Sequence, residues 1–165
     1  TESAARAANP HDHTVLVPAF SGLSAPYWKD SAKAVLYGMT RVTGRNEIIR
    51  AALESIALQI QAVLEAMEKD SGLPIRELRV DGGPTRNAFL MQEQSDLAGL
   101  KVAVAETEEL SALGAAYLAG IGAGIYEKDR LFREERRSYY EPKMNEKERT
   151  ERLEDWRQAV SMIMR

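Results

Sequence analysis

The chain contains no cysteine among its 165 residues, and this absence excludes a disulfide framework and any metal site built on thiolates. The absence also fits a cytoplasmic protein, which is the location we expect. Histidine is nearly as scarce, because its only two copies are His11 and His13, close to the amino end. A Ser-His-Asp catalytic set is therefore not expected.

Long apolar runs and basic clusters are also lacking. The least polar stretch, residues 110–126, is rich in alanine and glycine and contains no run of about 20 strongly apolar residues. The chain does not open with a basic segment followed by an apolar core, so we expect no secretory signal. Its net charge is −3, without the basic surface that nucleic-acid binding requires. We expect neither a membrane span nor a nucleic-acid partner.

The pattern of apolar residues predicts one α/β domain. With 44% hydrophobic and 28% charged residues, the composition is typical of a folded domain and argues against disorder. Short apolar runs predict strands at residues 14–20, 34–39, 78–81 and 101–104. Apolar residues at three- and four-residue spacing predict helices at 46–70, 86–98, 111–122 and 146–164. We expect strands 78–81 and 101–104 to be parallel neighbours, joined by helix 86–98 in a right-handed crossover.

Two of the predicted helices carry a well-defined apolar side. The helix at 46–70, with Asn46 as its expected N-cap, has a broad stripe suited to packing on a sheet. The charged helix at 146–164 should cover the domain, because a lone charged helix has marginal stability in water. The stripe of the first helix consists of Ile48, Ile49, Ala52, Leu53, Ile56, Ala57, Ile60, Val63, Leu64 and Met67, and the buried side of the second of Leu153, Trp156, Val160 and Ile163.

The turn after strand 78–81 is the strongest candidate for a functional site. Asp81, Gly82 and Gly83 lie between a predicted strand and a predicted helix. This order directs backbone N–H groups and the positive end of the helix dipole towards an anion. Two glycines let a phosphate or ribose approach the main chain, and the Asn87 amide lies within reach of the same ligand. An Asp-Gly pair is also common in structural turns, and this alternative stays open.

Three weaker candidates each have a structural alternative. His11 and His13 suggest a metal site, but no third ligand is in view, and a linker role is favoured. Tyr27 and Trp28 follow Pro26 and either stack on a ligand or pin a loop to the core, the second being favoured. Three acids precede a predicted helix, where they suit the helix dipole better than acid–base catalysis. These acids are Glu106, Glu108 and Glu109.

Several spaced blocks together resemble the FGGY family of carbohydrate kinases, and among them most closely the branch that phosphorylates glycerol. The resemblance covers nearly the whole chain after residue 14. Five blocks in the expected order are far more specific than any one of them. The blocks span residues 17–28 (VPAFSGLSAPYW), 34–57 (AVLYGMTRVTGRNEIIRAALESIA), 79–83 (RVDGG), 87–96 (NAFLMQEQSD) and 112–120 (ALGAAYLAG), and the tail from Tyr140 to Val160 is similar as well.

The resemblance implies a fold and a role. Family members have two actin-like, ribonuclease-H-like domains with ATP and Mg²⁺ in the cleft between them. Residues 14–165 look like most of the C-terminal domain, with a covering helix at 146–164, and residues 1–13 like the end of a preceding helix and a linker. The catalytic base, the Mg²⁺ ligands and the polyol contacts are then expected outside this chain, so no catalytic or metal-binding residue is assigned here.

By position, Gly83 and Asn87 match the family's nucleotide-contacting glycine and asparagine, and Gly82 shapes the turn. The resemblance therefore implies a nucleotide-binding site at Gly82, Gly83 and Asn87. The expected function is ATP-dependent transfer of phosphate to glycerol, with the chain inactive alone. Its partners would be the N-terminal kinase domain, ATP or ADP, the polyol held by the other domain, and further copies in a homodimer or tetramer.

Three residues depart from the pattern of the glycerol-specific branch. Lys29 follows the Pro-Tyr-Trp triplet where Asp is usual, Ala34 replaces a common Gly, and Pro84 replaces a small residue. Proline has no N–H, so Pro84 removes one phosphate donor while suiting a first helical turn. The alternatives are a kinase for another polyol or a ketose such as xylulose, or a non-enzymatic actin-like nucleotide-binding module.

Overall fold

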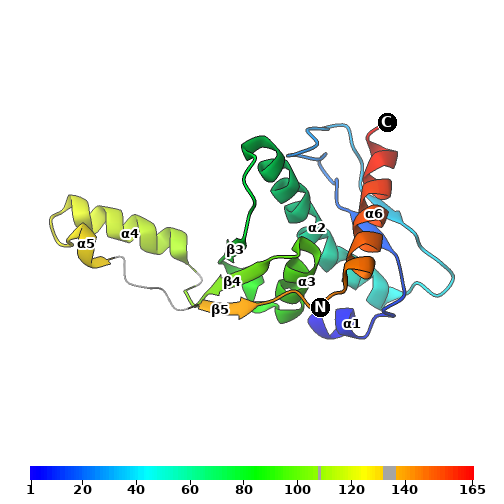
Figure 1. Ribbon diagram of the computed structural model, residues 1–165, viewed down its shortest axis with the longest axis horizontal. Coiled ribbons are helices and arrows are strands. Elements are labelled where there is room, and N and C mark those ends of the chain that lie inside the picture. Colours follow the sequence, from blue (N-terminus) through cyan, green and yellow to red (C-terminus); the bar gives the residue numbers. More distant parts are fainter. Residues whose placement is uncertain (108, 132–136) are drawn as a thin grey trace.

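A computed structural model describes residues 1–107, 109–131 and 137–165. Figure 1 shows a main body of helices and short strands from which one helical arm projects. In chain order the elements are α1 (Glu2–Arg6), β1 (Val15–Val17), β2 (Val35–Tyr37), α2 (Arg45–Ser71), β3 (Glu77–Val80), η1 (Gly83–Arg86), α3 (Ala88–Ala98), β4 (Lys101–Ala105), α4 (Leu110–Gly122), α5 (Lys128–Leu131), β5 (Arg137–Tyr140) and α6 (Glu146–Ile163).

The main sheet has the order β3-β4-β5 among the described residues. Strands β3 and β4 are parallel, with Val80 opposite Val104, which confirms the predicted pairing of the two strands flanking α3. Strand β5 pairs antiparallel with β4 and was not predicted, because it lies in a charged segment without an apolar run. Strands β1 and β2 form a separate antiparallel pair. Strand β1 ends at Val17, immediately before Pro18, which has no N–H to donate to a ladder.

Helix α2 forms as predicted, but its N-cap and its buried side differ from the prediction. The N-cap is Gly44, whose N–H donates to the Glu47 side chain at 2.9 Å, and Asn46 lies inside the first turn. Gly72, with φ of 67°, ends the helix in the left-handed conformation. The structure buries Glu54, Ser55 and Gln61 together with Ala57, Leu58 and Leu64 of the same helix.

Part of the predicted apolar stripe of α2 is therefore exposed. Ile56 keeps 41% and Met67 54% of their surface accessible. The reason is that α1, α3 and β1 pack on α2, and the residues that α2 buries lie mostly on a different face from the predicted stripe. Periodicity located the helix correctly, whereas the face in contact was set by its neighbours.

Two apolar clusters hold the body together. The larger lies beneath α6 and includes Val17, Leu97, Trp156 and Val160, and the smaller joins α3 to the sheet through Leu90, Met91, Val102 and Val104. Trp156 and Val160 are 2% and 4% exposed. The prediction that the charged tail helix packs as a cover is thus confirmed.

The arm consists of α4 and α5 and extends away from the sheet in Figure 1. Gly120 is the single buried residue of α4, and the ring of Tyr126 covers it. Leu118 on the same helix is 73% exposed. None of the described helices is long and apolar enough to cross a membrane.

Candidate functional site

The predicted Gly-Gly turn lies at the carboxyl end of β3. Strand β3 ends at Val80, and Asp81 and Gly82 lead into the short 3-10 helix η1, followed directly by α3. The turn is tied by two hydrogen bonds to the Gly82 carbonyl, from the Thr85 N–H at 3.0 Å and the Thr85 hydroxyl at 2.8 Å. The structure thus has the order strand, tight turn, helix that anion-binding loops use.

The two glycines have different environments. Gly82 has φ of 93° and ψ of 172°, a conformation that is essentially restricted to glycine. Gly83 has no positive φ, it is exposed, and a Cβ added to it would meet no atom within 4 Å. The backbone therefore requires glycine at position 82, while nothing within the described part of the chain requires it at position 83.

Asn87 occupies the N-cap of α3, so this helix begins two residues later than predicted. Its Oδ1 accepts a hydrogen bond from the Leu90 N–H at 3.1 Å. The Asn87 N–H donates to the Pro84 carbonyl at 3.1 Å, which joins η1 to α3. The Asn87 side chain therefore has a structural role as a cap, and its Nδ2 group has no partner among the described residues.

Together these residues form an open, polar surface at the start of α3. Pro84 contributes no N–H, whereas the first turn of α3 supplies donors and the positive end of its dipole. An anionic group can approach the Gly83 backbone without meeting a side chain. The arrangement suits recognition of a phosphate or a sugar hydroxyl, and it contains no acid–base pair.

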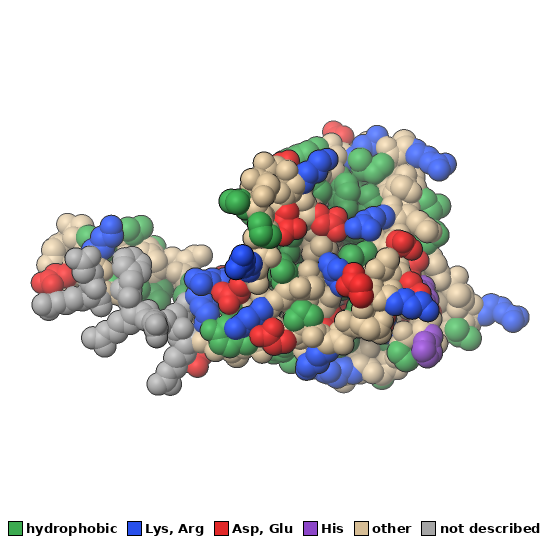
Figure 2. Space-filling model, in the orientation of Figure 1, with side chains coloured by type: hydrophobic (Ala, Val, Ile, Leu, Met, Phe, Trp, Pro, Cys, Tyr) green, Lys and Arg blue, Asp and Glu red, His purple; other side chains and the backbone are tan. Residues whose placement is uncertain are grey.

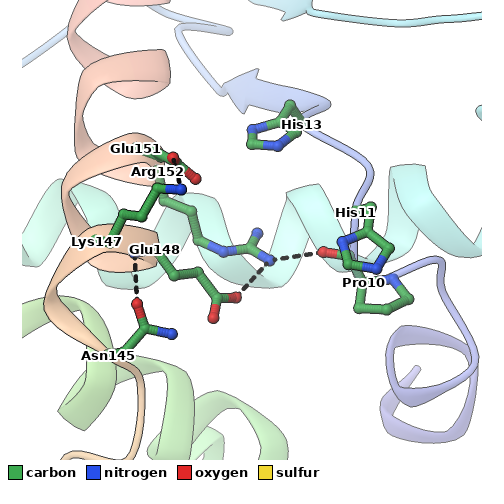
Figure 3. A pocket seen from close by; sticks show the side chains of 8 residues that line it. All are labelled: Pro10, His11, His13, Asn145, Lys147, Glu148, Glu151 and Arg152. Atoms are coloured by element: carbon green, nitrogen blue, oxygen red, sulfur yellow. Dashed lines mark hydrogen bonds and ion pairs between the residues drawn. The ribbon is translucent and has the colours of Figure 1, made fainter.

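The two histidines lie in the segment between α1 and β1, beside α6. His13 Nδ1 lies 2.7 Å from Asp155 Oδ2, which ties this segment to α6. Figure 3 shows both imidazoles with Arg152 and acidic side chains of α6 around a cavity of about 300 Å³. Among the residues that the structure describes, no three His, Asp or Glu side chains are arranged to hold a metal ion.

The aromatic pair divides between the two roles considered for it. The hydroxyl of Tyr27 accepts a hydrogen bond from Trp156 Nε1 at 3.1 Å, and burial raises the pKa of Tyr27. Trp28, with φ of 51°, is 78% exposed. Pinning of the loop to the core is therefore correct for Tyr27 and wrong for Trp28.

The acids before α4 make no catalytic cluster in the described part of the chain. Glu109 occupies the N-cap position of α4 without a side-chain capping bond, and Glu106 is exposed. Glu108 lies outside the described residues.

Sequence reasoning missed a buried charge cluster between α2, α3 and α6. Glu54 accepts hydrogen bonds from Arg50 at 2.5 Å and from Arg152 at 3.1 Å, and Glu93 lies beside them. Glu93 and Arg152 lie at positions where the apolar spacing of their helices points inwards, whereas Glu54 lies off the predicted apolar stripe of α2. Only the packing of three helices distinguishes such a residue from a solvated one.

A second missed feature explains the Gln94-Ser95-Asp96 segment. Asp96 Oδ1 accepts the N–H groups of Lys143 and Met144, and the Ser95 hydroxyl donates to carbonyls of Leu100 and Tyr140. These contacts fasten the segment between β5 and α6 to α3. Ser95 and Asp96 therefore serve the fold and not the candidate site.

Comparison with known proteins places the chain in one family. Residues 1–123 match the family described as "FGGY family of carbohydrate kinases, C-terminal domain". The glycerol kinase of Dechloromonas aromatica (strain RCB) is 48% identical over 163 residues, which cover 96% of this chain and 32% of that relative. The glycerol kinase of Escherichia coli O139:H28 (strain E24377A / ETEC) is 47% identical over 156 residues, covering 90% and 30%.

Solved structures agree on the fold. The crystal structure of Plasmodium falciparum glycerol kinase with ADP matches with a TM-score of 0.83 at 35% identity, covering 98% of this chain and 33% of that one. A ligand-bound xylulose kinase from Lactobacillus acidophilus matches with a TM-score of 0.77 at 20% identity, which supports the fold alone. The chain spans about a third of the length of the curated relatives it matches. With these matches and the strand–turn–helix geometry, the chain belongs to the FGGY family of carbohydrate kinases, to whose C-terminal, actin-like domain it corresponds.

Proposed function

We propose that this chain is part of an ATP-dependent glycerol kinase and forms the wall of its cleft that faces the adenosine of ATP. The observation that carries the proposal is the open Gly83 backbone at the start of η1, between β3 and α3, since no contact in the described chain accounts for a glycine there. A ligand that comes close to the main chain does account for it. The match to a glycerol kinase crystallised with ADP supports a nucleotide as that ligand.

In this proposal Gly82, Gly83 and Asn87 are the nucleotide-binding residues. Gly82 sets the turn, Gly83 lies against the α-phosphate or ribose, and the Asn87 amide donates a hydrogen bond nearby. The capping bond to Leu90 uses the Asn87 oxygen and leaves its nitrogen for the ligand. The cap thus holds the amide in place for binding.

Phosphoryl transfer depends chiefly on positioning and on stabilising charge around the γ-phosphate and Mg²⁺. We assign the general base, the Mg²⁺ ligands and the polyol contacts to the remainder of the kinase. We therefore expect the 165-residue chain alone to phosphorylate no glycerol, and detectable turnover by the purified chain would refute this division of roles.

Two exposed features support the remainder of the kinase as the partner. Helix α4 exposes apolar residues such as Leu118, and β3 has β4 as its only neighbour among the described strands. An apolar helix and an open strand edge are surfaces that folded proteins cover. We propose that residues 1–13 enter from that remainder as the end of a helix and a linker, and that residues 14–165 belong to the C-terminal domain.

Glycerol is favoured as the substrate by the identities of the relatives. The glycerol kinases of Dechloromonas aromatica and Escherichia coli are 48% and 47% identical to this chain, and the xylulose kinase is 20% identical. A kinase for xylulose or another polyol is the second candidate, and Lys29 and Ala34 are the residues that favour it. We further propose a cytoplasmic location and a homodimer or tetramer.

A graded pair of substitutions in the full-length kinase tests the nucleotide site. Gly83→Ala adds one methyl group and Gly83→Val a branched side chain where the ligand must approach. We expect the apparent dissociation constant for ATP to rise with side-chain size and to exceed the wild-type value roughly tenfold or more for valine. The melting temperature should stay constant, because a Cβ at Gly83 meets no atom within 4 Å. If folded Gly83→Val has an apparent dissociation constant for ATP within about twofold of the wild-type value, the turn has only a structural role.

Asn87→Ala should also weaken ATP binding. The loss of one or two hydrogen bonds at about 0.5–1.5 kcal/mol each costs about 0.5–3 kcal/mol, and within that range we expect a weakening of roughly threefold to thirtyfold. Because this change also removes the cap of α3, Asn87→Asp is the control variant. It keeps the capping oxygen but loses the amide donor and adds a negative charge that repels the nucleotide, so it should bind ATP at least as weakly as Asn87→Ala while retaining normal stability.

A further inference from the structure

The buried charge cluster contains one carboxyl group without a partner. Glu93 on α3 is 9% exposed, and its Oε2 is buried with no hydrogen-bond partner. No hydrogen bond or ion pair reaches either of its oxygens from the described part of the chain. Burial and the neighbouring carboxylate of Glu54 raise the pKa of Glu93 to about 7, although Arg50 and Arg152 oppose the rise.

The hydrogen bonds of the two arginines go to groups other than Glu93, and Arg152 Nε is itself buried without a hydrogen-bond partner in the described part of the chain. Arg50 donates to Glu54 at 2.5 Å and to the Asn9 carbonyl at 3.3 Å. Arg152 donates to Glu54 at 3.1 Å and to Pro10 and Glu148. Figure 3 shows Arg152 reaching between Glu148 and Pro10. Three carboxyl groups thus share two guanidinium groups, and an ionised Glu93 would be an uncompensated buried charge.

The same arginines hold residues 7–13, here called the linker, which make up most of the segment that joins α1 to β1. The Asn9 and Pro10 carbonyls each accept one arginine donor at 3.3 Å. Glu93 lines a cavity of about 340 Å³ together with Ala5, Ala8 and Pro10. The cavity gives an ionised carboxylate and a reoriented guanidinium room to meet.

We propose that Glu93 is a proton-controlled latch for the linker. With a proton on Glu93, Arg50 and Arg152 remain on the Asn9 and Pro10 carbonyls and the linker is held. When Glu93 releases that proton to solvent, its carboxylate draws the guanidinium groups towards itself and the linker and α1 loosen. No bond other than the O–H bond of the carboxyl group is broken.

The direction of the pH effect follows from the raised pKa. The folded protein binds the proton of Glu93 more tightly than the unfolded chain does, so it binds more protons in the window between the two pKa values. The stabilisation is complete below the ordinary glutamate pKa of about 4.5 and is lost as the pH rises through about 7. The latch is therefore closed in mild acid and open in mild base.

Other charged groups lie on every element that packs against Glu93 and the linker. Hydrogen bonds from backbone N–H groups, that of Asn9 first, lower the pKa of Glu47. Histidine as a residue class changes charge between pH 5 and 8. The groups are Glu2 and Arg6 of α1, His11, Asp12 and His13 of the linker, Glu47, Arg50 and Glu54 of α2, Asp96 of α3, and Glu148, Arg149, Arg152 and Asp155 of α6.

Hydrogen–deuterium exchange in the full-length protein tests the latch. Exchange of peptides covering residues 2–13 is measured from pH 5.5 to 8.5 and divided by the intrinsic amide rate at each pH. We expect protection of the linker to fall at least roughly threefold across this range in the wild type. In Glu93→Gln, which keeps the shape without the charge, protection should stay high throughout, while β4 peptides serve as an internal reference.

The hydrogen bond between His13 and Asp155 provides the control, because it also holds the linker and involves a histidine, the residue class that changes charge between pH 5 and 8. Asp155→Asn should keep the pH-dependent fall in protection. A fall that persists in Glu93→Gln and disappears in Asp155→Asn would make His13 the sensor and overturn the proposal. A flat wild-type profile would overturn it as well. Glu93→Met, which is apolar and of similar volume, replaces Glu93→Gln if the latter does not fold.

Discussion

Helices α4 and α6 have opposite compositions and opposite degrees of burial. Helix α4 is almost entirely apolar and buries only Gly120, whereas the charged helix α6 buries Leu153, Trp156, Ala159 and Val160 together with Arg152. In α6 the buried residues share one face at three- and four-residue spacing, and that face meets a core built by α2, α3 and β1. Burial thus follows the presence of a complementary surface and not the hydrophobicity of the helix.

The exposure of α4 indicates that its apolar surface is available for contact with another segment. A helix with small residues on several sides lets other segments pack closely against it. In the described part of the chain, the ring of Tyr126 covers Gly120, whereas Gly114 and Gly122 have open space beside them. Under the proposed function, the rest of the kinase supplies that surface. The body around α6 is then complete within this chain, and the arm is not.

Trp156→Ala should have the largest effect, because it removes the central side chain of the α6 interface. The ring is 2% exposed and its Nε1 donates to Tyr27. We expect the free energy of unfolding to fall by about 3 kcal/mol or more, measured by urea denaturation followed by circular dichroism. Trp28→Ala is the matched control, since Trp28 is 78% exposed. Equal losses for both tryptophans would contradict the role given to the α6 interface.

Arg149→Ala should come next, because Arg149 joins α6 to the last turn of α3. Its Nε donates to the Leu97 carbonyl at 2.9 Å and its Nη2 to the Ala98 carbonyl at 3.3 Å. Hydrogen bonds from a charged donor are worth about 1.5–3 kcal/mol, and partial exposure places the expected loss near the lower end. The surface pair between Arg157 and Glu65 provides the comparison, and Arg157→Ala should cost less than about 0.5 kcal/mol. The same urea titration measures both.

Asn145→Ala compares the starts of the two helices. Asn145 caps α6 by accepting the Glu148 N–H at 3.0 Å, while Glu109 makes no capping bond at the start of α4. We expect Asn145→Ala to reduce the free energy of unfolding by about 1 kcal/mol and Glu109→Ala to change it by a few tenths. Asn145→Asp, which keeps the capping oxygen, should restore normal stability. A loss in Asn145→Asp as large as in Asn145→Ala would rule out the cap as the cause.

Leu118→Ser should change the stability of this chain least, and it should lower the stability of the full-length kinase more. Leu118 is 73% exposed, so in the 165-residue chain the change should stay within about 0.5 kcal/mol. If the rest of the kinase covers α4, the same substitution should lower the melting temperature of the full-length protein clearly. An unchanged melting temperature there would show that this face of α4 is not covered.

Local sequence determined much of the fold. Apolar spacing located α2, α3, α4 and α6 to within about two residues, and the short apolar runs of β3 and β4 on either side of α3 predicted their parallel pairing. These features were predictable because each depends on residues a few positions apart. The Gly82-Gly83 turn was recognisable for the same reason, and the family was recognisable from five blocks in order.

Tertiary structure decided which surfaces are used. The pairing of β5 with β4 and the rotation of the buried face of α2 depend on neighbours far away in the sequence. So does the burial of Glu93, whose environment is made by α2, α6 and the linker. The sequence alone determined which elements form and which of their sides are apolar. Only the packing of these elements determined which sides are covered and which charges lose contact with water, because burial and the pKa of a buried group depend on atoms that distant segments bring together.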